Sequence, residues 1–255
     1  MRAKIFYSVF AISAFLVLWF VISGYYNSPL FPGPIETVYA FFSILATQDG
    51  WYQIGVTFYR VFIGTLLGSC AGALCGILPR YSKMAEYAVR SVVYPLFESI
   101  PALCWVLVFV VWFGLSDVTP ILAISTAVIP FFIINIWEGV KELDESLIEM
   151  AHTCTRNRLR ILRKVIMPML YPYAFSAFKT SFEVAWKVVI LGEVFGAACG
   201  IGYMLWISYE VYAIEYVFAW TLCCAIIIIV FDYVLFNYID RRYMRRWKRG
   251  REKKC

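Results

Sequence analysis

Long apolar runs dominate the chain, and short polar or charged segments separate them. A run of about 20 apolar residues is long enough for a helix to cross the hydrocarbon core of a membrane. The backbone finds no water there, so helices that satisfy their own hydrogen bonds are the expected structure. The pattern predicts an all-α polytopic membrane protein with six spans, near residues 5–24, 56–78, 88–113, 118–137, 169–195 and 213–238.

Two further features refine this pattern at its start. The run at 5–24 follows a basic N-terminus, as in a signal peptide, but it is about as long as a span needs, and no A-x-A-like cleavage site follows. We therefore expect it to remain as the first span. The segment at about 30–46 is amphipathic and too interrupted to cross, which predicts an interfacial helix on the outer side.

Composition supports membrane embedding. The 255 residues are 62% hydrophobic, with a mean hydropathy of +0.73, whereas soluble chains are roughly 45–50% apolar. This length fits one membrane domain, residues 1–255, with little left for a separate soluble domain. The eight cysteines form no CxxC pair, and His152 is the only histidine. These observations favour cysteines as small apolar fillers rather than a disulfide framework or a metal site.

The basic residues orient the predicted spans. Every Lys and Arg falls on one side of the membrane except Arg60, Lys179 and Lys187, which lie within spans. The positive-inside rule then places both termini in the cytoplasm of a multi-pass cell-membrane protein. The basic cytoplasmic tail at 239–255 follows the last span directly, so a topology anchor attracted to anionic lipid is favoured over a nucleic-acid-binding tail.

Spans two and three contain residues that bear on helix packing. Four glycines recur every fourth residue in span two and so form one ridge that a neighbouring helix can approach closely: Gly64, Gly68, Gly72 and Gly76. In span three, Pro95 and Pro101 bracket Glu98 and predict a disturbed helix. A carboxylate in a span usually faces a cavity or a partner, so Glu98 is a candidate either for the pathway or for packing.

Span five carries charges on one helical face. Lys179, Glu183 and Lys187 are spaced four residues apart, and Glu193 lies near the outer end. Two interpretations remain open: a polar face that lines a translocation path, or an ion-pair ladder that only stabilises the bundle. We favour the path, because a ladder alone leaves one lysine unmatched.

The cytoplasmic segment at about 141–167 is helix-patterned and basic. Leu147, Met150, Ala151 and Cys154 fall at helical spacing, and Thr155–Asn157 offers a break between two short helices. Such a helix lies on the membrane or docks into a groove of another protein.

The chain lacks the motifs of an enzyme. It contains no GxxxxGK motif followed by Ser or Thr, no HExxH and no GxSxG. A polar membrane path without an energy source of its own requires a partner protein or an ion gradient.

The segment after span four resembles the EAA motif of binding-protein-dependent ABC importer permeases. The likeness rests on Glu149-Met150-Ala151, on Thr155, and on Val165-Ile166-Met167-Pro168 at the family's spacing. This chain departs from the family pattern at Met150, Thr155, Val165 and Met167. Thr155 replaces the family's glycine, and Asn157 is a residue type that tolerates a left-handed turn angle.

Three other stretches resemble permeases of the nitrate, sulfonate and taurine type, in the same order along the chain. They are VTFYRVFIGTLLG with Arg60, IPALCWVLVFVVWFG, and AWKVVILGEVFGAACGIGYML with Lys187, Glu193 and Gly200. The second stretch has Leu107 where the family has a proline. The likeness extends over about residues 30–240.

The resemblance implies a type I ABC importer permease fold and a function in the cell membrane of a prokaryote. Two permease chains, expected to be a homodimer, would form the pathway above two cytoplasmic ATPase subunits, which would bind ATP and Mg²⁺, while this chain would bind no cofactor. A solute-binding protein would deliver substrate from outside. The helix at about 145–154 would dock on an ATPase through six residues: Glu149, Met150, Ala151, His152, Cys154 and Thr155.

Two further hypotheses compete with this one. An ion-coupled secondary transporter would use Lys179, Glu183 and Glu98 as relay groups, and a membrane scaffold or insertase would have no transport cycle. Neither needs an ATPase-docking helix, so the EAA-like segment favours the importer. Arg60, Lys179 and Lys187 favour an anion such as a sulfonate, nitrate or a carboxylate, whereas the nearby glutamates and the resemblance to importers of vitamin precursors leave other solutes open.

Overall fold

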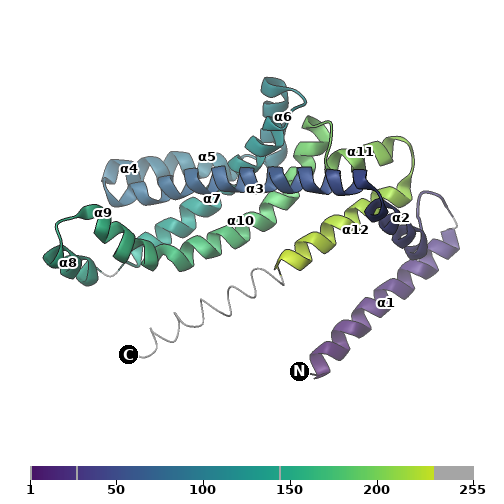
Figure 1. Cartoon of the computed structure of the whole chain (residues 1–255), viewed down its shortest axis with the longest axis horizontal. Coiled ribbons are helices and arrows are strands. Elements are labelled where there is room, and N and C mark those ends of the chain that lie inside the picture. Colours follow the sequence, from purple (N-terminus) through teal and green to yellow (C-terminus); the bar gives the residue numbers. More distant parts are fainter. Residues whose placement is uncertain (1, 27, 144, 233–255) are drawn as a thin grey trace. The chain divides into compact units, whose positions relative to one another are not determined.

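A computed structural model describes residues 2–26, 28–143 and 145–232, and these residues are almost entirely helical (Figure 1). The basic tail at 239–255 and the end of the last predicted span lie outside them. The α-helices are α1 (Arg2–Tyr26), α2 (Pro34–Ala46), α3 (Gln48–Ile77), α4 (Lys83–Ala88), α5 (Tyr94–Ser99), α6 (Ala102–Phe113), α7 (Val118–Lys141), α8 (Glu145–Cys154), α9 (Arg158–Ile161), α10 (Met167–Gly196), α11 (Ile201–Glu210) and α12 (Ile214–Val230). No strand occurs in the described part of the chain.

The helical lengths bear on the predicted spans. Two continuous helical stretches of the described chain, Gln48–Arg80 and Val118–Lys141, are long and apolar enough to cross a membrane. The number rises to four if Lys83–Ser99 with α6, and Leu159–Gly196 with α11, each form one bent span. The apolar parts of α1 and α12 are shorter in the described residues. The count of six spans and the cytoplasmic location of the termini stay predictions.

The disturbed third span is confirmed as a sharp break. Helix α5 ends at Ser99, Ile100 is extended, and Pro101 caps the start of α6, with a bend of 83° between the two helical pieces. Proline disfavours a helical conformation at the preceding residue, which explains why Ile100 leaves the helix. Helix α6 continues unbroken through Leu107, where the resembling permeases have a proline.

The described chain forms two compact units, which we treat separately. The first contains residues 2–57 and 199–227. Within it α1 contacts α2, and the Trp19 ring stacks on Phe218 with centroids 5.9 Å apart. Trp19 also donates from its indole nitrogen to the Pro32 carbonyl oxygen at 3.2 Å, which ties α1 to the turn before α2.

The second unit contains residues 58–198 and 228–232. Helices α7 and α10 lie side by side in it, and α6 packs on both (Figure 1). The glycine ridge of α3 faces α7, as the spacing predicted. A Cβ added at any of its four glycines would fall 2.6 to 2.9 Å from an atom of α7. Helix α10 meets the start of α7 in the same way, because Gly192 lies against Pro120 and Gly196 against Thr119.

This close packing makes a prediction for Gly72. An added methyl group would sit 2.6 Å from the Ile129 carbonyl oxygen and from the Phe132 Cβ atom, so we expect Gly72→Ala to lower the stability by about 1 to 3 kcal/mol. Gly55 on the same helix is exposed and has no atom within 4 Å of an added Cβ. Gly55→Ala should therefore be neutral or stabilising by up to about 1 kcal/mol. Thermal unfolding of the purified variants in detergent checks both, and equal midpoints for the two would contradict the packing argument.

Candidate functional site

The predicted coupling segment is a defined helix. The interval expected at about 145–154 coincides with α8. Ile148 is buried, and α8 packs against the π-helical turn at Leu162–Ile166. Helix α8 is therefore attached to its own chain on the side that carries Ile148, and its opposite side is exposed.

Most of the α8 residues singled out in the sequence are exposed. Glu149, Met150, His152 and Cys154 are exposed, and Ala151 is half-buried. Met150 is 60% exposed on a helix that the sequence predicts to lie outside the membrane, where an apolar side chain is suited to contact with another protein. Met150 and Cys154 thus lie on the outer surface of α8, whereas the contact with the rest of the chain is made through Ile148.

The break after α8 forms without a left-handed residue. The Thr155 amide donates to the Ala151 carbonyl oxygen at 3.0 Å, and the Thr155 hydroxyl oxygen accepts from the Asn157 amide at 3.3 Å. The Asn157 side chain then accepts from the Arg160 amide at 3.2 Å and caps α9. Tyr212 is the only non-glycine residue with a positive φ in the described chain. The left-handed angle considered for Asn157 is therefore wrong, because its side chain caps a helix instead.

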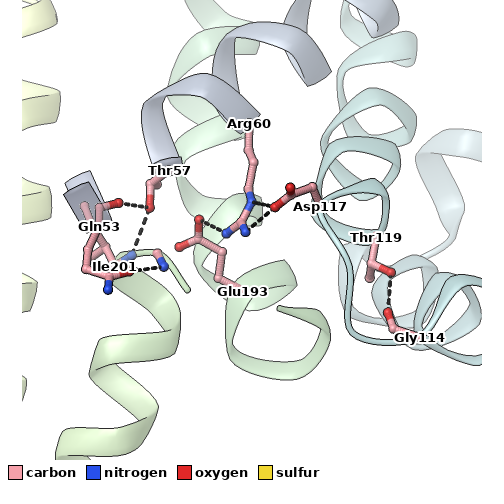
Figure 2. A network of polar contacts seen from close by, with 9 residues as sticks. Gln53, Thr57, Arg60, Gly114, Asp117, Thr119, Glu193 and Ile201 are labelled. Carbon is pink, nitrogen blue, oxygen red and sulfur yellow. Dashed lines mark hydrogen bonds and ion pairs between the residues drawn. The ribbon is translucent and has the colours of Figure 1, made fainter. Parts of the chain in front are cut away.

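A second candidate site is a buried charge cluster in the second unit (Figure 2). Arg60 of α3 donates to the Glu193 carboxylate of α10 at 2.8 Å. The same guanidinium donates to Asp117, at the start of α7, from two nitrogens at 2.5 and 3.0 Å. One side chain thereby joins three helices.

The three charged side chains differ in how deeply they are buried. The side chains of Arg60 and Glu193 are 1% and 0% exposed, whereas that of Asp117 is 61% exposed. Placing a charge within a span costs about 2.5 to 3.5 kcal/mol on insertion scales, which favours pairing between buried residues. Because two carboxylates meet one guanidinium, Arg60 does not contribute an uncompensated positive charge.

A separate polar contact lies in the first unit (Figure 2). The Gln53 side chain of α3 accepts from the Gly200 amide at 2.6 Å, and the Thr57 hydroxyl oxygen accepts from the Ile201 amide at 2.9 Å. These groups satisfy backbone donors at the start of α11, which has no other side-chain cap. Gly200 has a φ of +107°, which explains the glycine at this position of the sequence motif.

The remaining charged candidates are not gathered into one cluster. Lys179 pairs with Asp232 at 2.7 Å. Glu183 is half-buried and Lys187 is exposed on α10, and neither forms an ion pair within the described residues. Glu98 is exposed at the end of α5. The ladder among Lys179, Glu183 and Lys187 does not form, because Lys179 has its partner on another segment.

Sequence reasoning missed four partners: Asp117, Asp232, Gln53 and Thr57. Asp232 was the easiest to find, since an acid inside the last predicted span needs a cation as much as Lys179 needs an acid. In the described residues no three His, Cys, Asp or Glu side chains gather as metal ligands, and the seven cysteines among them are free thiols.

The buried pair makes a prediction about stability. Arg60→Met would leave the Glu193 carboxylate buried and unpaired, so we expect a loss of about 3 to 5 kcal/mol. Arg60→Met combined with Glu193→Leu should recover much of that loss, because no buried charge remains. Asp117→Asn should have a smaller effect than Arg60→Met, since Asp117 is largely exposed. Thermal unfolding of the purified variants measures these losses of stability. A double variant no more stable than Arg60→Met would refute the pairing argument.

Comparison with known proteins places this arrangement in a family. Residues 64–245 match the model of the "Binding-protein-dependent transport system inner membrane component" family. The chain is similar to a putative aliphatic sulfonates transport permease protein of Bacillus subtilis (strain 168), with 26% identity over 93% of this chain and 86% of that protein. It is also similar to a nitrate import permease protein of Synechococcus elongatus, with 28% identity over 79% of this chain and 76% of that protein.

A solved structure supports the fold. A chain of the MetNI methionine ABC transporter in an inward-facing conformation matches with a TM-score of 0.60 and 19% identity, over 78% of this chain and 95% of that chain. The family match covers more than half of the sequence and includes α8 and most of the second unit. The chain therefore belongs to the family of binding-protein-dependent transport system inner membrane components, the permease subunits of ABC importers.

Proposed function

We propose that this permease is driven by cytoplasmic ATPase subunits that dock on α8. The observation that carries the proposal is the exposure of Glu149, Met150, His152 and Cys154 on α8, while Ile148 is buried against its own chain. A short amphipathic helix with an exposed methionine fits a groove on a partner protein, since methionine adapts to irregular apolar surfaces.

The connection from α8 to the membrane part supports a mechanical role. Helix α9, the turn at Leu162–Ile166 and α10 follow one another without a coil residue between them. Helix α8 packs against that turn, and Ile161 at the end of α9 is buried. A displacement of α8 would therefore act on the cytoplasmic end of α10, the helix that carries Lys179, Glu183 and Lys187.

The full assembly in this proposal contains two copies of the chain, two ATPase subunits and an extracytoplasmic solute-binding protein. ATP and Mg²⁺ would bind at the ATPases, because the chain has no phosphate-binding GxxxxGK motif. This organisation fits the family of inner membrane components to which the chain belongs.

The solute is proposed as a small sulfonate- or nitrate-like anion, with a vitamin precursor as the other candidate. The similar permeases named for sulfonates and nitrate support the first. The cations of the spans give it only partial support, because Arg60 faces two carboxylates and Lys179 faces Asp232. Lys187 is the remaining cation within a predicted span. We therefore propose that the choice of solute rests mainly on the binding protein.

Docking through α8 is tested by reversing one charge. Glu149→Arg should abolish copurification of the ATPase and solute uptake, because it reverses the charge of an exposed residue of the proposed docking helix. Glu138→Arg, an equal charge change at an exposed site on α7, should leave both intact. Retention of ATPase binding and uptake by Glu149→Arg would overturn the proposed docking site.

Labelling of Cys154 tests two points: the side of the membrane on which α8 lies, and whether the ATPase covers this helix. In a chain that keeps only this cysteine, a membrane-impermeant maleimide should label Cys154 in inverted vesicles and not in intact cells. Addition of the ATPase should reduce the labelling rate several-fold, because the partner would cover the thiol. A cysteine placed at the exposed Lys83 should also label only in inverted vesicles, without ATPase protection. Labelling of Cys154 from outside intact cells would contradict the predicted orientation.

A further inference from the structure

Two cationic side chains of the second unit lie over the ring of one tryptophan. The Lys141 Nζ atom is 4.3 Å from the centroid of the Trp137 ring, and the Arg90 Cζ atom is 5.9 Å from it. Arg90 belongs to the π-helical turn Val89–Val93, which leads into α5, and α5 packs on α7. The tryptophan is 7% exposed, whereas both cations are exposed. We call these three side chains the Trp137 cluster.

The cluster brings two like charges together. Their repulsion is offset in part by the ring, because tryptophan attracts cations more strongly than the other aromatic side chains do. Neither Arg90 nor Lys141 forms an ion pair within the described residues. Of the acids close to them in sequence, Glu86 and Glu138 pair with neither cation, and Glu142 accepts from a tyrosine hydroxyl of α10. The cluster therefore lacks a negative partner in the part of the chain that the structure describes.

The first unit and the basic tail are poor sources of that partner. The first unit contains four acids, and all of them fall in segments predicted on the outer side of the membrane: Glu36, Asp49, Glu210 and Glu215. The tail at 239–255 carries nine Lys and Arg residues against two acids. Both segments therefore add positive charge to the predicted cytoplasmic side, so a negative ligand from outside the chain fits the cluster best.

The position of the cluster along the chain points to a lipid. Arg90 stands at the start of the third predicted span and Lys141 follows the fourth, both on the predicted cytoplasmic side. Tryptophan is enriched at the level of lipid headgroups, and basic pockets between membrane helices on this side suit anionic headgroups. The apolar Val92 and Leu96 are exposed one and two turns further into the predicted span. The chain thus offers cations at headgroup level and apolar side chains where acyl chains would lie.

We propose that the Trp137 cluster binds the headgroup of an anionic phospholipid of the cytoplasmic leaflet. Arg90 and Lys141 donate charge-assisted hydrogen bonds to the phosphate oxygens, and the Trp137 ring keeps both cations close together before the lipid arrives. The inference goes beyond the proposed function, because this ligand is not the transported solute. It also does not depend on the docking of an ATPase on α8, so either can fail alone.

The test measures lipid binding to the purified full-length chain in detergent by native mass spectrometry. A salt concentration of about 0.2 M screens the general attraction between exposed charges. Wild type should bind phosphatidylglycerol roughly tenfold more tightly than phosphatidylcholine, whose headgroup has no net charge. Arg90→Gln combined with Lys141→Gln should lower the affinity for phosphatidylglycerol by roughly tenfold or more, because two cations near the headgroup are lost. Equal binding of the two lipids by wild type would overturn the inference.

A matched double variant controls for surface charge. Lys83→Gln combined with Arg160→Gln also removes one lysine and one arginine from exposed positions on the predicted cytoplasmic side. Neither of these residues lies over an aromatic ring in the described chain. This control should bind phosphatidylglycerol within about twofold of wild type at the same salt concentration. An equal loss in the two double variants would show general attraction without a site.

Trp137→Phe tests the ring while both cations remain. Phenylalanine attracts cations more weakly than tryptophan, so the affinity for phosphatidylglycerol should fall several-fold, to a value between those of wild type and the cation double variant. Unchanged affinity would contradict the role given to the ring. Thermal unfolding adds a second readout, because a ligand that binds the folded chain raises the unfolding midpoint. Phosphatidylglycerol should raise the midpoint of wild type and not that of the cation double variant.

Inorganic phosphate distinguishes a lipid headgroup from a soluble anion. A large excess of phosphate should leave the affinity of wild type for phosphatidylglycerol within about twofold, because the acyl chains also contribute to lipid binding. Displacement of the lipid by phosphate, in wild type but not in the cation double variant, would mean that the cluster takes a soluble anion. The proposed ligand would then be wrong.

The two acids of the basic tail are tested in the same way. A chain with Asp240→Asn and Glu252→Gln should bind phosphatidylglycerol as wild type does. Binding that becomes several-fold tighter, and that still requires Arg90 and Lys141, would show that a tail acid occupies the Trp137 cluster in the wild-type chain. That result would overturn the lipid as its natural occupant.

Discussion

Charged side chains inside the spans need partners, and this requirement organises the second unit. Arg60 is buried on α3 because Glu193 of α10 and Asp117 at the start of α7 both accept from its guanidinium. The contact is possible only if those three helices meet at one height. Replacement of such a cluster by apolar residues can preserve stability, so its value lies as much in fixing which helices meet as in the energy of the pair.

Small residues provide the distances at which these charges meet. The glycines of α3 lie against α7, and Gly192 of α10, the residue just before the buried Glu193, lies against Pro120. Lipid gives helices little hydrophobic reason to associate, so close backbone contact has to supply the attraction. The glycine contacts and the Arg60 cluster therefore support each other: the first brings the helices within reach, and the second fixes their register.

The sequence predicted those features that depend on local pattern. Helix α8, the break at Thr155–Asn157 and the packing face of the α3 glycines follow from spacing along one helix. Long-range partners were not predictable in this way. The charges of Lys179 and Asp232 each indicate that a partner is needed within the membrane, but the local sequence does not say which residue it is. The backbone donors at the start of α11 are likewise capped by Gln53 and Thr57 from far along the chain. The exposure of Met150 likewise required knowledge that Ile148 makes the contact with the rest of the chain.

Helix α10 connects the surroundings of α8 with the Arg60 cluster. Helix α10 begins next to the turn that α8 contacts, carries Glu183 and Lys187 in its middle, and places Glu193 in the Arg60 cluster near its far end. The Arg60 cluster and the glycine contacts hold the far end against α3 and α7. The near end is held against α7 as well, because Leu170 and Tyr173 pack against Gly139 and the Tyr173 hydroxyl donates to Glu142. With both ends of α10 fixed on α7, a force applied near α8 would move these two helices together rather than bend one past the other.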